Sequence, residues 1–176
     1  MKSVKLIANI LYYITKIISI LYLVTGAYVL GVVLLSKTSS ASWIPIDVLS
    51  DGSFRIFYPF TRTPFILGEY NNSYLVISIA IILLYGLFLW LLSGVFNAFR
   101  QERLFTPKNV SRLKRFYRFN VIIPVLSLLI LAIIGYELSD VVGIGFLHLL
   151  AGVFAFFMAA IFKQGLVLQE EQDLTL

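Results

Sequence analysis

The sequence predicts an all-α membrane protein with four transmembrane helices and a small outer β-hairpin loop between the first and second helices. Hydrophobic residues make up 60% of the 176 residues, whereas soluble domains are roughly 45–50% apolar. Lipid must therefore cover part of the apolar surface. Apolar runs of about 20 residues also alternate with shorter polar segments, and about 20 residues of helix cross the ~30 Å hydrocarbon core of a bilayer. We expect one membrane domain over residues 1–176, with spans at about 17–36, 74–96, 119–136 and 141–162.

The orientation follows from a basic segment between the second and third spans, residues 97–118. Its part from Arg100 to Arg118 carries seven of the fourteen basic residues and one acidic residue, Glu102. Loops rich in Lys and Arg stay on the cytoplasmic side of a membrane. The sequence therefore predicts a multi-pass protein with both termini in the cytoplasm. Because these charges lie beside apolar spans, they indicate anionic lipid rather than direct nucleic-acid binding.

The first span follows an amphipathic lead-in, and Lys16 is expected to reach the inner headgroups as an anchor. The outer loop, residues 37–73, contains two strand-like pieces, 46–49 and 54–58. Between them, Asp51-Gly52 is typical of a tight hairpin turn, because glycine accepts positive φ values. The sequence therefore predicts a small hairpin on the outer side.

The third and fourth spans carry their own local signals. Thr106-Pro107 is typical of a helix start, because Thr caps the helix and Pro fits its first position. We expect that helix to continue without a break into the third span.

Small or polar residues recur on one face of the fourth span, and small residues let helices pack closely in lipid. This seam consists of Gly145, His148, Gly152, Ala155 and Ala159.

The residue types argue against catalysis. The chain has one His and no Cys, and its carboxylates other than Glu102 lie in the outer loops or the tail. A nucleophile, a base and an orienting group within reach of one another are not evident, so we expect no enzyme activity, no cofactor and no metal site. His148 is the intramembrane polar candidate, and such residues are functional candidates by default. The alternative is a neutral imidazole that hydrogen-bonds across the bundle, to Tyr28 or Tyr85.

The basic segment and the acidic tail, residues 163–176, are both expected on the cytoplasmic face. We expect them to form a surface for lipid or a soluble partner, made of Asn109, Arg112, Lys114, Arg115, Glu170, Glu171 and Asp173. Exposed ion pairs contribute only ~0–1 kcal/mol, so a partner could displace a contact between the two charge groups. The simpler interpretation, a topology signal beside a solvated tail, stays open.

Two stretches, 104–114 and 165–176, resemble the bacterial membrane family catalogued as domain of unknown function 2975. Its members similarly have four spans, a Phe, then Asn, then Arg-Leu pattern after the second span, and an acidic tail ending near Asp-Leu-Thr. The chain departs at Lys114, Arg115 and Phe116, where the family often has Arg and then Ile-Gly. The resemblance implies a bacterial inner-membrane protein without assigned activity. Members often look to be encoded beside a small helix-turn-helix regulator, which suggests a DNA-binding partner.

The expected function is a non-enzymatic membrane regulatory protein that holds or senses through a cytoplasmic partner, such as that regulator. The alternative is a small-molecule or ion permeation, export or immunity protein. The predicted spans lack the buried Asp, Glu, Lys or Arg that ion-coupled transporters usually need. A homo-oligomer is left open.

Overall fold

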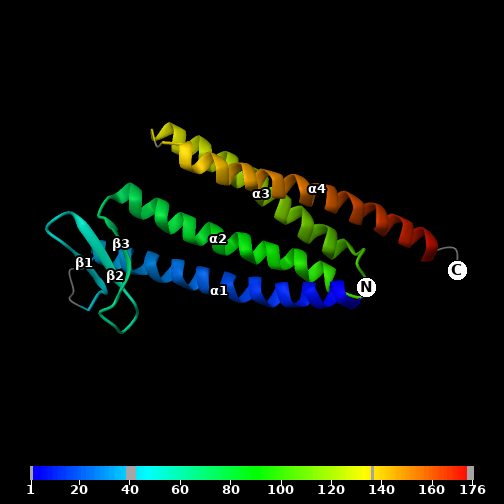
Figure 1. Cartoon of the computed structure of the whole chain (residues 1–176), viewed down its shortest axis with the longest axis horizontal. Coiled ribbons are helices and arrows are strands. Elements are labelled where there is room, and N and C mark those ends of the chain that lie inside the picture. Colours follow the sequence, from blue (N-terminus) through cyan, green and yellow to red (C-terminus); the bar gives the residue numbers. More distant parts are fainter. Residues whose placement is uncertain (1, 39–42, 136, 174–176) are drawn as a thin grey trace. The chain divides into compact units, whose positions relative to one another are not determined.

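The computed structural model describes residues 2–38, 43–135 and 137–173. Figure 1 shows its helices and strands, which are α1 (Lys2–Thr38), β1 (Ile46–Val48), β2 (Ser53–Phe57), β3 (Pro64–Glu69), α2 (Asn72–Phe99), α3 (Pro107–Ile133) and α4 (Ser139–Asp173). Within these described ranges, four helices are long and apolar enough to cross a membrane. The prediction of four long apolar helices, with strands between the first and second, is therefore confirmed.

All four helices are longer than the predicted spans, and one of them, α3, also ends earlier than predicted. The helix α1 is continuous from Lys2, so the expected lead-in and first span form one helix. The helix α3 ends at Ile133, three residues before the predicted end of the third span at 136. Gly135, with φ of 71°, follows the C-cap residue Ile134. A left-handed glycine just after the cap is a common way to end a helix, and it corrects the predicted boundary.

The chain divides into two compact units, which are described separately. The sheet unit comprises Ile17–Leu87 and therefore contains all three strands. The α3–α4 unit comprises Met1–Lys16 and Phe88–Leu176. The single membrane domain expected from the sequence stays a prediction.

The sheet is antiparallel with strand order β1-β2-β3. The predicted hairpin is confirmed, because Ile46 pairs with Ile56 and Gly52 has φ of 80° in the turn. The sequence analysis did not predict the third strand, β3. Pro64 is the first residue of an edge strand, a position where its missing N–H is tolerated.

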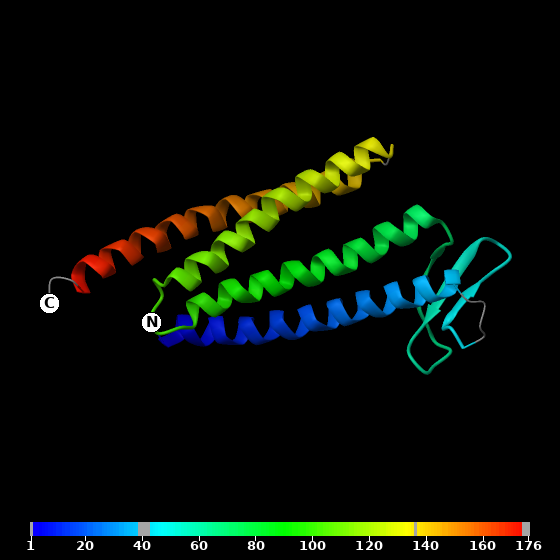
Figure 2. The same ribbon diagram turned by 180° about the vertical axis from the view of Figure 1, so that it is seen from behind.

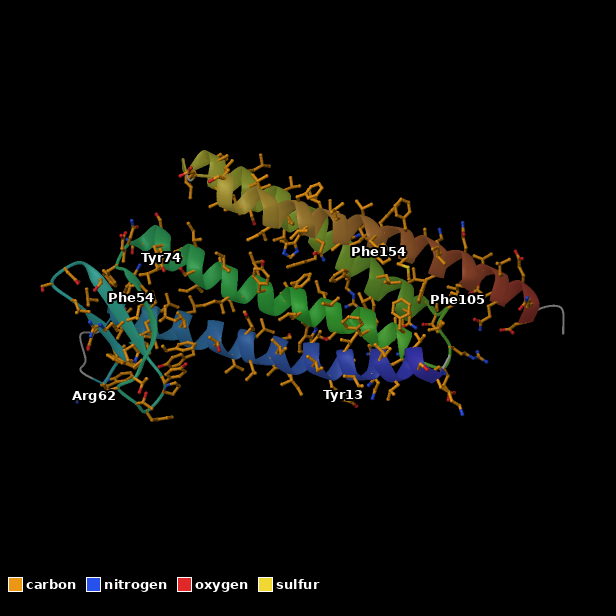
Figure 3. The ribbon with its side chains drawn as sticks, in the orientation of Figure 1. Tyr13, Phe54, Arg62, Tyr74, Phe105 and Phe154 are labelled. Carbon is orange, nitrogen blue, oxygen red and sulfur yellow. The ribbon has the colours of Figure 1, made fainter. Side chains whose placement is uncertain are left out.

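One face of β2 forms the core of the sheet unit. Phe54 and Ile56 are buried, with 1% and 0% of their surface exposed, while Arg55 between them is exposed. Successive side chains of a strand point to opposite faces, so this alternation directs Phe54 and Ile56 to the helices. They pack in a cluster with Val29, Val32 and Val33 of α1 and Leu75 and Ile79 of α2. Figure 3 shows Phe54 beside Tyr74. The two rings pack edge-on, and their centroids are 6.3 Å apart.

In the α3–α4 unit, the predicted start of α3 is confirmed. Thr106 is the N-cap, its hydroxyl accepts a hydrogen bond from the Asn109 amide N–H at 3.2 Å, and Pro107 opens the helix. From there α3 runs without a break to Ile133. Figure 2 shows α3 beside α4, with the last turns of α4 extending past the start of α3.

The predicted seam on α4 is also confirmed as a buried face. Gly145, Gly152, Ala155 and Ala159 are all buried. A Cβ added at Gly152 would lie 2.9 Å from Cγ2 of Val121 on α3, which is closer than real Cβ contacts. The small residues therefore let α3 and α4 approach each other closely.

Candidate functional site

The connection between α2 and α3 is organised by one buried side chain, Asn109, which has none of its surface exposed. Its amide nitrogen donates to the carbonyl of Leu104 at 2.9 Å and to Oε1 of Gln101 at 3.3 Å. Its oxygen accepts a hydrogen bond from Nη1 of Arg112 at 2.8 Å. Because Arg112 lies three residues after Asn109, both side chains share one face of α3. The Asn-x-x-Arg spacing therefore fixes the loop and the guanidinium together.

The same loop packs against α4 through Phe105. The rings of Phe105 and Phe162 meet edge-on with centroids 5.5 Å apart. A Cβ added at Gly165 would lie 2.6 Å from Cδ1 of Phe105, so the aromatic ring occupies the space that a side chain would need. Leu113 and Ala159 belong to the same apolar cluster. The two stretches that carry the family resemblance, 104–114 and 165–176, thus meet at this point.

Two of the predicted surface residues, Arg112 and Arg115, line a pocket together with Lys16 of α1. This basic pocket has a volume of about 180 Å³. Its lining residues are Tyr12, Lys16, Trp90, Leu91, Ser93, Gly94, Asn97, Arg112 and Arg115. The lining contains three cationic side chains and no acidic one.

Aromatic rings lie beside two basic side chains, Lys16 of this pocket and Arg100, which is outside the lining. The Lys16 ammonium lies over the ring of Trp90, within the ~6 Å range of a cation–π contact. The guanidinium of Arg100 lies 4.0 Å from the centre of the Tyr12 ring. Arg100 also donates to Oδ1 of Asn9 at 3.0 Å and to Oδ1 of Asn97 at 2.9 Å. Arg100 therefore joins the N-terminal part of α1 to the last turns of α2.

The remaining predicted surface residues lie elsewhere in the α3–α4 unit. Lys114 is half-buried and does not line the basic pocket. The acidic side chains Glu170, Glu171 and Asp173 are exposed on the last turns of α4. The described contacts include no ion pair between these carboxylates and the basic residues of α3. Their mutual attraction stays a prediction.

His148 has a partner that the sequence did not indicate. Its Nδ1 lies 2.8 Å from Oδ1 of Asn120, a side chain with none of its surface exposed. The amide nitrogen of Asn120 donates to the Phe116 carbonyl at 2.9 Å, so the oxygen accepts and His148 Nδ1 is the donor. Tyr28, one of the two expected partners, instead donates to the Phe57 carbonyl at 2.7 Å. Whether His148 has a function beyond packing stays open.

Sequence reasoning missed Lys16, Tyr12 and Trp90 as parts of a site. Lys16 was assigned to the inner headgroups, and Trp90 lies near the cytoplasmic end of the predicted second span, so their similar depth was the available signal. Among the described residues, no group of three or more His, Cys, Asp or Glu side chains could hold a metal ion.

Within the described residues, these features define a class of protein with four helices long and apolar enough to cross a membrane, a small three-stranded antiparallel sheet and a basic loop folded around a buried asparagine. The family model described as a protein of unknown function, DUF2975, matches residues 43–176. The chain belongs to this family, and the resemblance seen in its sequence is confirmed. No curated protein and no solved structure is similar enough to the chain to count as a match.

Proposed function

We propose that the chain is a non-enzymatic protein of the bacterial inner membrane that regulates a cytoplasmic partner by holding it or sensing through it. In this proposal both termini lie in the cytoplasm, and the partner is a small helix-turn-helix regulator. The observation that supports it most is the packing of Phe105 against Phe162 and Gly165. This packing builds the basic loop and the base of the acidic tail into one structure.

The length of α4 supports a surface that projects from the membrane. The helix has 35 residues, and about 20 are enough to cross the hydrocarbon core. The last turns therefore extend beyond the bilayer as a helix and carry Glu170, Glu171 and Asp173, which are exposed. A DNA-binding regulator has a basic DNA-contacting face. An acidic helix is complementary to that face and would hold the regulator away from DNA.

The orientation in this proposal is supported by the distribution of charge. Seven basic residues lie between Arg100 and Arg118, and such segments stay in the cytoplasm. Reporter fusions at Asp51 and Asp140 should report the outer side, and fusions at Lys108 and Leu176 the cytoplasm. A cytoplasmic reporter that is active at Asp51 would overturn the orientation.

The function is tested by deleting residues 169–176, which removes the acidic turns and leaves the apolar part of α4. The truncated protein should insert normally, but it should no longer co-purify from native membranes with a small helix-turn-helix regulator. Replacing Glu170 and Glu171 with Gln and Asp173 with Asn should have the same effect, because the proposed attraction is electrostatic. The matched control is Asp47→Asn with Glu69→Gln, which neutralises two carboxylates of the sheet and should leave the partner bound. Retention of the regulator by both tail variants would contradict the proposal.

A further inference from the structure

A second site lies apart from the acidic tail, in the basic pocket. We propose that this pocket binds the phosphate group of an anionic ligand, either a lipid headgroup or a small soluble phosphate. The proposal does not depend on the regulatory function, because it rests on different residues. It rests on the presence of Lys16, Arg112 and Arg115 in the lining of one pocket.

The first argument is the balance of charge. Lys16 comes from α1, and Arg112 and Arg115 come from α3, so separate elements bring like charges together. Like charges held together in a partly desolvated space repel one another, and a bound anion relieves that cost. The chain has nine acidic residues, yet none lines the pocket. An external anion is therefore the natural counter-charge.

The second argument is the geometry of the donors. A guanidinium presents five N–H donors in a planar fork that matches two phosphate oxygens. Arg112 uses Nη1 to bind Oδ1 of the buried Asn109 at 2.8 Å, which leaves its other donors for a ligand. Asn109 therefore acts as a positioning residue that holds the fork in place. Trp90 positions the Lys16 ammonium in a similar way.

The third argument is the size and the surroundings of the pocket. Its volume of about 180 Å³ is below the ~300–1,000 Å³ of pockets that enclose drug-sized ligands. It has room for a phosphate with a small substituent. Trp90 and Leu91 also line it, and tryptophan is enriched at membrane–water interfaces. Basic pockets between membrane helices are known to bind lipid phosphates, so the surroundings suit a headgroup.

The test uses Trp90 as the reporter. The chain has two tryptophans, and Trp43 lies in the sheet unit, so Trp43→Phe leaves Trp90 as the one indole. The full-length Trp43→Phe protein in neutral detergent micelles is titrated separately with phosphatidylglycerol, phosphatidylcholine and inorganic phosphate. We expect a saturable change of Trp90 fluorescence with phosphatidylglycerol that phosphatidylcholine does not produce. A response to phosphatidylglycerol alone identifies a headgroup site, and a response to inorganic phosphate as well identifies a soluble phosphate ligand.

Charge variants made in the same Trp43→Phe protein assign the response to the pocket. Arg115→Gln and Lys16→Gln should each weaken anion binding at least fivefold, and Lys16→Arg should restore it. The matched control is Arg118→Gln, which removes the same charge from α3 at an exposed position outside the pocket lining and should change affinity less than twofold. Because Arg115 is itself exposed, its replacement should keep the fold even if the Lys16 variant does not. Equal responses to the two lipids, or equal losses in Arg115→Gln and Arg118→Gln, would overturn the proposal.

Discussion

The two units differ in the amide side chains that they bury. In the sheet unit the largest fully buried side chains are apolar, Phe54 and Ile56. In the α3–α4 unit, Leu113 is also fully buried, but the amides of Asn109 and Asn120 are equally inaccessible. An apolar core needs volume and shape, whereas a buried amide needs particular partners at hydrogen-bond distance. The contrast teaches that the sheet is held mainly by area removed from solvent, and the basic loop by specific polar contacts.

The largest expected effect comes from truncating a buried apolar side chain of the sheet unit. Phe54→Ala should destabilise the sheet unit by about 3–5 kcal/mol, the usual cost of truncating a buried Phe. Hydrogen exchange in detergent micelles should rise in β1–β3 and stay unchanged in residues 101–113. The control is Leu67→Ala on β3, where 59% of the side chain is exposed, and it should have a small effect. Equal effects of the two variants would contradict an apolar core at Phe54.

The polar contacts of the basic loop are removed by Asn109→Leu, which keeps a similar side-chain volume but has no amide. The Leu104 carbonyl and the Arg112 guanidinium then lose their partner, at about 1–3 kcal/mol for a buried group left without a hydrogen bond. We expect a loss of about 2–3 kcal/mol, measured by chemical unfolding in micelles. Exchange should rise in residues 101–113, the reverse of the Phe54 pattern.

Asn109→Asp sharpens the interpretation of that result. The aspartate keeps an oxygen for Arg112 but loses the donor to the Leu104 carbonyl. It should therefore loosen the loop while keeping the guanidinium in place. If Asn109→Leu leaves exchange in residues 101–113 unchanged, the buried amide does not hold the loop.

The contrast also explains what one sequence can predict. The seam on α4, the start of α3 at Thr106 and the turn at Gly52 were predictable, because each depends on residues near one another in the chain. The Arg112–Asn109 contact, the Asn120–His148 contact and the basic pocket were not predicted. The last two require knowing how helices are rotated and at what depth residues face one another, which hydropathy does not specify. The strand β3 was not predicted, and its first residue, Pro64, weakens a strand pattern, although an edge position tolerates it.

The next effect concerns the seam between α3 and α4. Gly152→Leu should destabilise the α3–α4 unit by about 1–3 kcal/mol, because overpacking forces neighbouring groups apart. A Cβ at Gly152 would already approach Val121 and Asn120 at 2.9 and 3.3 Å. Ala160→Leu adds a side chain at an exposed position of the same helix and should be mild. Equal thermal unfolding midpoints of the two variants in detergent would contradict close packing of α3 and α4 at Gly152.

The smallest expected effect is a pH response confined to the sheet unit. Oδ1 of Asp51 accepts hydrogen bonds from the Ser53 hydroxyl at 2.7 Å and from the Ser53 amide N–H at 2.9 Å. The hydroxyl bond, followed by the amide bond, lowers the pKa of Asp51 below its ordinary value. A carboxyl whose folded-state pKa is lowered adds stability above its unfolded pKa of about 3.9 and loses that stability as pH falls through the folded value. The turn should therefore weaken below about pH 4.

The Asp51→Asn variant tests this response, because the amide oxygen still accepts hydrogen bonds but does not titrate in this range. In a Trp90→Phe protein, Trp43 remains as the reporter within the sheet unit. Below about pH 4, the unfolding midpoint followed by Trp43 should fall more steeply when Asp51 is present than in the Asp51→Asn variant. Residues 101–113 should show no such difference between the two proteins, because Asn109 makes its hydrogen bonds there with neutral groups and Arg112. Parallel pH curves for Trp43 in the two proteins would show that the Asp51 carboxylate does not stabilise the turn.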